Sequence, residues 1–278
     1  MTDVSLNAAT RANLLDLQRN AQLRLQTTNR FASGRRVNRV VDDPVRFSQS
    51  SALSNRIGDL LSLKQGTGQA LSATEAALKG VDAIEGLTQQ LRGLAGAARS
   101  ATGQQRQTIA QQFNVVRSQI DALAADVTYG GISLLGNPAD TLRTRVGNVS
   151  GGDITVAGQA SDTSALGIGS ATATYNNFAT EADINAALTA TDNAVTTLRS
   201  SASRFGSSVA SLNIAENFNQ SLSATLQAGQ DKLVNTDLNQ EAANLLSINI
   251  RDQLGQQGLR IAQRSDTAIS QLLSGING

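Results

Sequence analysis

The chain of 278 residues contains no cysteine and no histidine. These absences exclude disulfides, thiolate nucleophiles, zinc sites built from Cys or His, and the imidazole base of the common hydrolase triads. An enzyme of this composition would have to use carboxylates, lysine, serine or tyrosine. Because no local constellation of these residues suggests catalysis, we expect a protein that is not an enzyme and that needs no cofactor or metal.

Aromatic residues are also scarce, with no tryptophan and only 3% Phe, Trp and Tyr together, although hydrophobic residues make up 40%. Without bulky rings a wide interior is difficult to fill, so packing in narrow seams between helices is favoured. The composition therefore indicates an elongated helical protein.

The chain also lacks a strong excess of charge and a long apolar run. Its net charge of +1 gives no overall field that would attract nucleic acid or a membrane surface. No apolar stretch approaches the roughly 20 residues that span a bilayer. The first twenty residues do not show the basic and apolar regions of a cleaved secretory signal, so export would use another route.

Apolar residues instead recur at the spacing of helical seams. One seam repeats in steps of 4 and 3 through Ile109, Phe113, Val116, Ile120, Leu123 and Val127. A longer one runs from Ile184 to Leu212 and continues at Phe218, Leu222 and Leu226, with Thr180 as its expected N-cap. A third runs from Leu53 to Leu94 and is interrupted by glycines. These patterns predict helices over about 45–102, 104–128 and 181–228.

Between residues 129 and 179 the helical period gives way to Gly, Ser, Thr and Asn. Within this segment Leu142 to Val146 alternates apolar and polar side chains, and Ile154 to Val156 follows a glycine-rich stretch. That pattern predicts a short β-hairpin. The expected fold class is mainly α, with long antiparallel coiled-coil helices forming a rod and a small β-hairpin and loop patch near mid-chain.

The two ends carry thinner helical stripes interrupted by small and polar residues. The expected seam residues are Leu14, Leu17, Ala21 and Leu25 at the start, and Leu246, Ile250, Leu254, Ile261 and Leu272 at the finish. Two such helices pairing only with each other would bury too little apolar area to offset their ordering entropy. We therefore expect them to need partners from outside the chain.

A basic run that includes Arg35 and Arg36 lies beside the acidic pair Asp42 and Asp43. Nucleic-acid binding is disfavoured because no aromatic residues interleave and carboxylates lie close by. A solvated face or a contact with neighbouring subunits explains the run better. Since Pro44 follows, the two carboxylates are expected to serve as helix N-terminal charges.

Several separated motifs resemble those of bacterial flagellin. Asn29 to Leu53, NRFASGRRVNRVVDDPVRFSQSSAL, is similar to the N-terminal signature of that family, and the segment Leu233 to Ile269 is similar to its C-terminal signature. Tyr129 to Leu135, YGGISLL, resembles the family's turn before the outer region. The short middle segment resembles a minimal flagellin with little outer domain.

The resemblance implies three parts, namely residues 1–42 and 236–278 as the two halves of an inner helical domain and residues 43–235 as a rod domain. It also implies an extracellular homopolymer, the flagellar filament, formed for motility after export of unfolded chains. The implied partners are other copies of the chain, the flagellar export machinery and a chaperone, the filament cap and the hook-junction proteins, with no nucleic acid or membrane. Contacts between subunits would involve the terminal seams together with Arg35 and Arg36.

Two other readings remain open at this point. A hook–filament junction protein shares both terminal signatures but is present in few copies and does not polymerise in bulk. A soluble coiled-coil adaptor or export chaperone would also explain the seams, but it would remain a discrete oligomer at high concentration.

Overall fold

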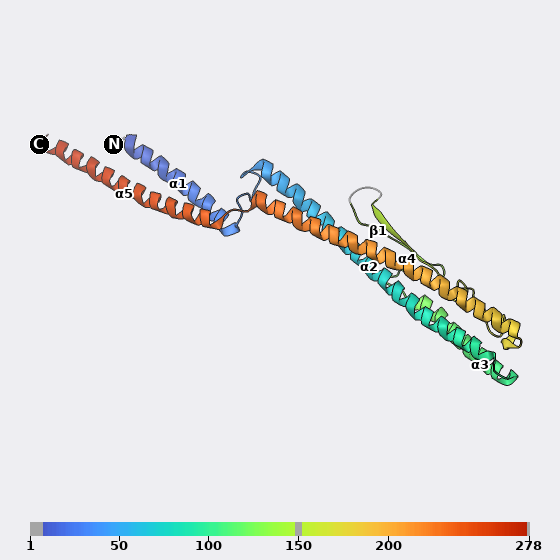
Figure 1. Ribbon diagram of the computed structural model, residues 1–278. Coiled ribbons are helices and arrows are strands. Elements are labelled where there is room, and N and C mark those ends of the chain that lie inside the picture. Colours follow the sequence, from blue (N-terminus) through green and yellow to red (C-terminus); the bar gives the residue numbers. More distant parts are fainter. Residues whose placement is uncertain (1–7, 148–151, 277–278) are drawn as a thin grey trace. The chain divides into compact units, whose positions relative to one another are not determined.

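The computed structural model describes the backbone of residues 8–147 and 152–276, and the side chains of these residues except 8, 9, 266, 269, 270 and 272–276. This part of the chain forms five long helices, a short 3-10 helix and one antiparallel pair of strands (Figure 1). The elements are α1 (Ala8–Ser33), α2 (Pro44–Ala98), α3 (Gly103–Asp126), β1 (Thr141–Arg145), β2 (Asp153–Ala157), η1 (Asn176–Phe178), α4 (Glu181–Val234) and α5 (Leu238–Ile276). The predicted mainly α fold with a small hairpin is confirmed.

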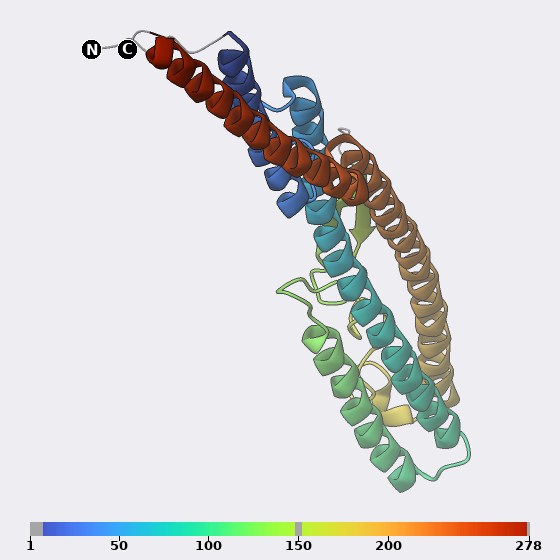
Figure 2. The ribbon, with the colours of Figure 1, turned by 90° about the vertical axis from the view of Figure 1, so that its left-hand side faces the viewer.

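The chain is divided into two compact units. The described parts of Met1–Asn55 and Leu226–Gly278 form one unit, and Arg56–Thr225 forms the other. In the first unit α1 lies alongside α5 (Figures 1 and 2). Helices α2 and α4 contribute residues to both units.

Two of the helices begin at a threonine whose side chain takes part in a capping box. The backbone N–H of Thr102 donates to Gln105 Oε1 at 2.9 Å at the start of α3. At the start of α4 the N–H of Thr180 donates to Asp183 Oδ2, while the N–H of Asp183 donates to Thr180 Oγ1. Such reciprocal bonds satisfy N–H groups that have no partner within the helix. The expected N-cap at Thr180 is confirmed.

Aspartates perform the same role for α2 and α5. Asp43 precedes Pro44 and accepts a hydrogen bond from the N–H of Arg46 at 3.0 Å. Asp237 accepts one from the N–H of Asn239 at 2.9 Å. Their negative charges also complement the positive ends of the helix dipoles. Four of the long helices therefore start at residues whose side chains fix the starting point.

In the larger unit α3 runs beside α2 (Figure 2). One face of α3 is fully or nearly fully buried. This face consists of Ala110, Phe113, Val116, Ile120 and Ala124. It coincides with the predicted seam in its centre, while Ile109 and Leu123 lie at its edge and are only partly buried. Phe113 packs edge-on against Phe178, with ring centroids 5.5 Å apart.

The hairpin lies in the same unit and packs one side of each strand inward. Leu142 is opposite Val156 in the antiparallel register, and Val156 and Thr144 are buried. The carbonyl of Val146 accepts a hydrogen bond at 3.2 Å from the side-chain amide of Asn219 on α4. The hairpin predicted from the alternation is confirmed, although residues 148–151 between the strands lie outside the described part.

One predicted core position on α4 is wrong. The spacing predicts that Phe218 continues the apolar face, but its side chain is 62% exposed. Asn219 takes the inward position instead, because its amide satisfies the Val146 carbonyl at the end of β1. A half-buried backbone acceptor is thus paired with a buried polar side chain, where an apolar one would leave it without this partner.

Candidate assembly surfaces on the terminal helices

The contact between α1 and α5 is narrow and largely polar. The buried or half-buried residues of α1 include a row at heptad steps, made of Thr10, Asn13, Leu17, Asn20 and Thr27. A similar row on α5 consists of Glu241, Leu245, Ile248, Asp252, Gly255 and Leu259. Since few of these side chains are large and apolar, the pair gains little from burial.

An ion pair crosses the middle of this contact. The Arg24 guanidinium lies 3.2 Å from Asp252 Oδ2, and the Asp252 carboxylate is largely buried. The second carboxylate oxygen, Oδ1, is buried with no hydrogen-bond partner among the described atoms. Because the Arg24 side chain remains about half exposed, water screens this ion pair, and it adds little to the stability of the contact.

Gly255 allows α5 to approach α1 closely. A Cβ atom at this position would lie 2.9 Å from Leu17 Cδ2. Leu17, predicted as a subunit-interface residue, is therefore half-buried within its own chain. Ala21, the next predicted residue, is also half-buried.

The apolar stripe of α5 points to the opposite side of the helix from this contact. Leu246, Leu254 and Ile261 are each 62% exposed and Ile250 is 48% exposed. Their spacing of four and seven residues keeps them on one face, and Asp252 lies roughly half a turn away. The side chain of Leu272 lies outside the described part, although its backbone belongs to α5.

Helix α1 likewise leaves leucines uncovered. Leu14 is 44% exposed and Leu25 is 65% exposed. Leu15 and Leu23, which the sequence reasoning did not single out, are exposed to a similar degree on other sides of the helix. They interrupt the heptad pattern, so a search for one regular stripe misses them.

The segment between α1 and α2 is tied to the segment between α4 and α5. The backbone N–H of Arg36 donates to the carbonyl of Val234 at 2.7 Å, and the N–H of Thr236 donates to the carbonyl of Gly34 at 3.0 Å. Arg35 pairs with Asn235 in an isolated antiparallel bridge and its side chain is exposed. Arg36 is half-buried, and its buried Nε has no hydrogen-bond partner among the described atoms.

The Asp42 side chain stabilises the loop between α1 and α2 through hydrogen bonds to its backbone. Its Oδ2 accepts hydrogen bonds from the backbone N–H groups of Arg39 at 2.9 Å and Asn38 at 3.0 Å. These bonds, aided by the charges of Arg39 and Arg30, lower the pKa of the Asp42 carboxyl. Of the two predicted helix-terminal carboxylates, only Asp43 caps α2, whereas Asp42 holds the loop.

This loop also exposes apolar side chains that the sequence reasoning did not select. Val40 and Val41 of the loop are 53% and 79% exposed, and Val45 in the first turn of α2 is 65% exposed. They lie among arginines and aspartates, so the sequence analysis treated this segment as a charged run and did not select its valines. Together with the leucines of α1 and α5, they leave several large apolar side chains exposed on this unit.

Two classes of site are not found in the part of the chain that the structure describes. No group of three or more carboxylates there is placed to hold a metal ion. None of the described helices contains a stretch apolar enough and long enough to cross a membrane.

Comparison with known proteins gives consistent matches. Residues 4–139 match the family model described as the bacterial flagellin N-terminal helical region. Flagellin FljK of Caulobacter vibrioides is 32% identical over 154 residues, and this match spans 55% of each chain. Flagellin FljM of the same organism is 26% identical over 258 residues, which is 91% of each chain.

A solved structure is also similar. The crystal structure of Bacillus cereus flagellin has 21% sequence identity and a TM-score of 0.48, and the match covers 55% of this chain and 88% of that one. The family-model match includes the N-terminal signature and α1, α2 and α3, while the alignment with FljM extends over nearly the whole chain. Together, the family-model match and the nearly full-length alignment with FljM support a bacterial flagellin.

Proposed function

We propose that this chain is a structural subunit that polymerises into the bacterial flagellar filament, and that its terminal helices complete their folding when other copies surround them. The observation that carries the proposal is the stripe of Leu246, Ile250, Leu254 and Ile261, which lies on the face of α5 that α1 does not cover. Full burial of such side chains is worth about 1.5–3 kcal/mol each. Neighbouring copies can supply this burial, whereas the α1–α5 contact does not.

The same argument extends to the rest of the proposed subunit interface. It comprises Leu14, Leu17, Ala21, Leu25, Arg35 and Arg36 in the first part of the chain, and Leu246, Ile250, Leu254, Ile261 and Leu272 in the last. Leu17 and Ala21 would serve both the α1–α5 contact and the contact with a neighbour. Because the surfaces differ on opposite sides of each helix, the contacts would be heterologous and the array open and helical.

This proposal assigns a different role to each part of the chain. Residues 1–42 and 236–278 would form the inner, assembly-dependent domain, and residues 43–235 the rod domain. The filament would be extracellular, built after export without a cleaved signal peptide. The export machinery and its chaperone, the filament cap and the hook-junction proteins would be transient partners, and the chain would have no catalytic role.

The test replaces three exposed residues of the α5 stripe by serine in the full chain, giving Leu246→Ser, Ile250→Ser and Leu254→Ser together. These side chains are already in solvent, so the helical content and melting temperature of the isolated chain should change little. Filament formation, followed by negative-stain electron microscopy after seeding, should be lost. The matched control changes three exposed polar residues of the same helix, Asn249, Gln253 and Gln256, to serine and should still polymerise.

Filaments of normal appearance from the triple leucine and isoleucine variant would overturn the proposed mechanism. The unmodified chain separates the other two readings. A failure of the pure protein to polymerise in bulk would favour a hook–filament junction protein, and a discrete oligomer at high concentration would favour a coiled-coil adaptor.

A further inference from the structure

The buried seam between α2 and α4 does not by itself define how the two helices are aligned. The seam residues of α2 recur every seven positions at Ala70, Ala77, Ile84, Leu91 and Ala98. Those of α4 recur every seven positions at Ile184, Thr191, Leu198, Phe205 and Leu212. A slip of seven residues would again place one seam row against the other, so the heptad pattern alone does not exclude it, although the side-chain sizes in each layer would no longer match.

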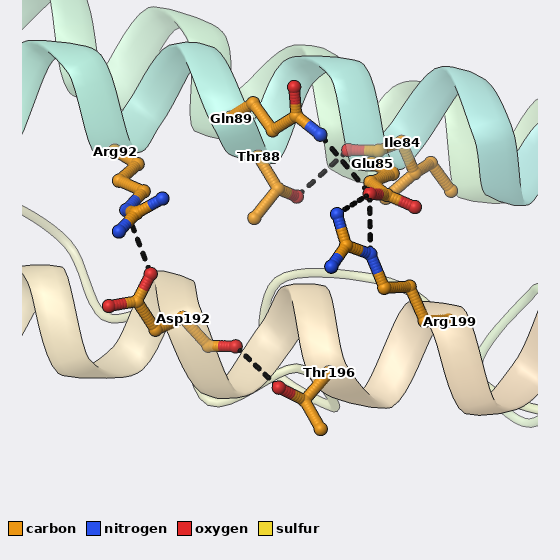
Figure 3. A network of polar contacts seen from close by, with 8 residues as sticks. All are labelled: Ile84, Glu85, Thr88, Gln89, Arg92, Asp192, Thr196 and Arg199. Carbon is orange, nitrogen blue, oxygen red and sulfur yellow. Dashed lines mark hydrogen bonds and ion pairs between the residues drawn. The ribbon is translucent and has the colours of Figure 1, made fainter.

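Polar pairs across the same two helices do distinguish the alignments. Arg199 lies 2.9 and 3.0 Å from Glu85 Oε1, and Arg92 lies 2.8 Å from Asp192 (Figure 3). From Glu85 to Arg92 the position on α2 advances by seven residues, and from Arg199 to Asp192 the partner on α4 moves back by seven. One further step of this kind pairs Arg99 with Asn185, and Arg99 donates a hydrogen bond to Asn185.

Farther along the helices Lys64 donates to Gln220 at 3.1 Å. These two residues lie three heptads from Glu85 and Arg199, so this pair has the same alignment. We call the four contacts, Lys64–Gln220, Glu85–Arg199, Arg92–Asp192 and Arg99–Asn185, the cross-helix polar pairs.

The order of charges opposes a slip in either direction. In one slip Glu85 would face Asp192. In the other Arg92 would face Arg199, and this repulsion offsets the new attraction between Arg99 and Asp192. Both slips also break the two ion pairs of the observed alignment. Glu85 is the most sensitive position because its side chain is only 18% exposed and also accepts a hydrogen bond from Gln89 at 3.1 Å (Figure 3).

We propose that the charges of Glu85, Arg92, Asp192 and Arg199 set the register of α2 against α4, where the heptad seam leaves it ambiguous. Exposed ion pairs contribute little to stability. Their effect on register is larger than their effect on stability, because a slip exchanges attractive pairs for repulsive ones. Charges that flank a coiled-coil seam select the alignment of its helices in the same way. Reversing the charges on one helix should change the ratio of observed to slipped register by about tenfold.

The experiment reverses the charges on α2 alone, with Glu85→Arg and Arg92→Glu in the full chain. In the observed register this variant opposes arginine to arginine and glutamate to aspartate. In one slipped register the carboxylate introduced at position 92 instead faces Arg199, and Arg99 faces Asp192. The compensated variant adds Asp192→Arg and Arg199→Asp, which restores attraction in the observed register.

Spin labels report the register directly. The chain has no cysteine, so Ala83→Cys and Ser221→Cys, both at exposed positions, direct the labels to one site on each helix. These sites are separated by about 30 Å along the helices in the observed register, and the favoured slip shortens the separation by about 10 Å. Double electron–electron resonance is measured after refolding from denaturant.

The α2 variant should show a second, shorter distance, and the compensated variant should return to the single distance of the unmodified chain. Refolding of the compensated variant where the α2 variant fails to fold would equally support the proposal, because only the pairing of charges differs. A single unchanged distance in the α2 variant would overturn the proposal. So would a compensated variant as altered as the α2 variant, or failure of both to fold.

A matched control tests for a general effect of moving charge along α2. Lys79→Glu with Asp82→Lys exchanges one positive and one negative residue at exposed positions outside the cross-helix polar pairs. This control should keep the single distance of the unmodified chain. A shorter distance there would contradict the assignment of the register to the four named charges.

Discussion

Adjacent residues of one type can have separate roles when the backbone around them differs. Asp43 caps α2 at the N–H of Arg46, whereas Asp42 turns back to the N–H groups of Asn38 and Arg39. The sequence reasoning assigned both to the start of the helix. Pro44 marks the helix start, but nothing in the local pattern shows that the preceding loop folds back onto Asp42.

The loop should lose stability in acid through Asp42. Hydrogen bonds from Arg39 and Asn38 lower its pKa below the usual 3.8, so its contribution is present above that pH and is lost as the pH falls through the lower, folded-state pKa. The protection of the Asn38 and Arg39 amides against hydrogen exchange, relative to an unstructured peptide at the same pH, should therefore fall at the lowest pH. In Asp42→Asn the two amides should exchange faster at neutral pH, with Asp59→Asn on α2 as the control. Equal protection in both variants would contradict this role.

Gly80 shows why a helix interior can require glycine. A Cβ atom there would lie 2.6 Å from Leu135 Cδ1 and 2.9 Å from Val127 Cγ2. The sequence shows only that glycines interrupt the apolar stripe of this segment. The close approach that requires Gly80 is to Val127 and Leu135, which follow α3.

Gly80→Ala should therefore destabilise the larger unit by about 1–3 kcal/mol, because overpacking outweighs the gain in helix propensity. Gly86→Ala, on an exposed part of the same helix with open space around it, should stabilise by about 0.5–1 kcal/mol. Urea denaturation monitored by circular dichroism measures both. Equal changes at the two positions would refute the packing argument.

At the scale of elements, heptad and alternation patterns were sufficient to predict the long helices and the hairpin. They did not predict how α1 and α5 face each other. The apolar stripe of Leu246, Ile250 and Leu254 was expected to form a seam, and in the single chain α5 instead turns Ile248, Asp252 and Gly255 toward α1. Both faces repeat at helical spacing, so sequence periodicity cannot choose between a contact within the chain and one with a neighbour.

Arg106 connects elements that are far apart in the sequence. Its Nε donates to the carbonyls of Ala98 and Ala101 after α2, and one guanidinium nitrogen donates to the carbonyls of Phe178 and Ala179 before α4. A long side chain is thus used to satisfy carbonyls at the end of one helix and beside the start of another. No motif in the sequence indicated this arrangement.

Arg106→Met should lower the free energy of unfolding by about 2 kcal/mol, because carbonyls lose charged donors while the apolar stem is kept. Arg143→Met, at an exposed arginine of β1, serves as the control and should change it by less than about 0.5 kcal/mol. Chemical denaturation gives both values. Hydrogen exchange should also rise near residues 98–101 and 178–184 in the first variant alone. Matching stabilities for the two variants would show that Arg106 does not tie these elements.

At the scale of the whole molecule, the account rests on the difference between the two units. The larger unit has a buried core that extends through α2, α3 and α4, whereas the α1–α5 pair has a thin polar contact and exposed leucines. Removing residues 246–278 should therefore abolish filaments and leave the helices of the larger unit folded. Ordered filaments from the truncated chain, seen by electron microscopy, would contradict this expectation.

The most direct measurement compares backbone hydrogen exchange of α1 and α5 in the isolated chain and in the filament. The account predicts rapid exchange of both helices in the isolated chain, slow exchange of α2 to α4, and strong protection of α1 and α5 after polymerisation. Terminal helices already fully protected in a chain with no tendency to associate would contradict it.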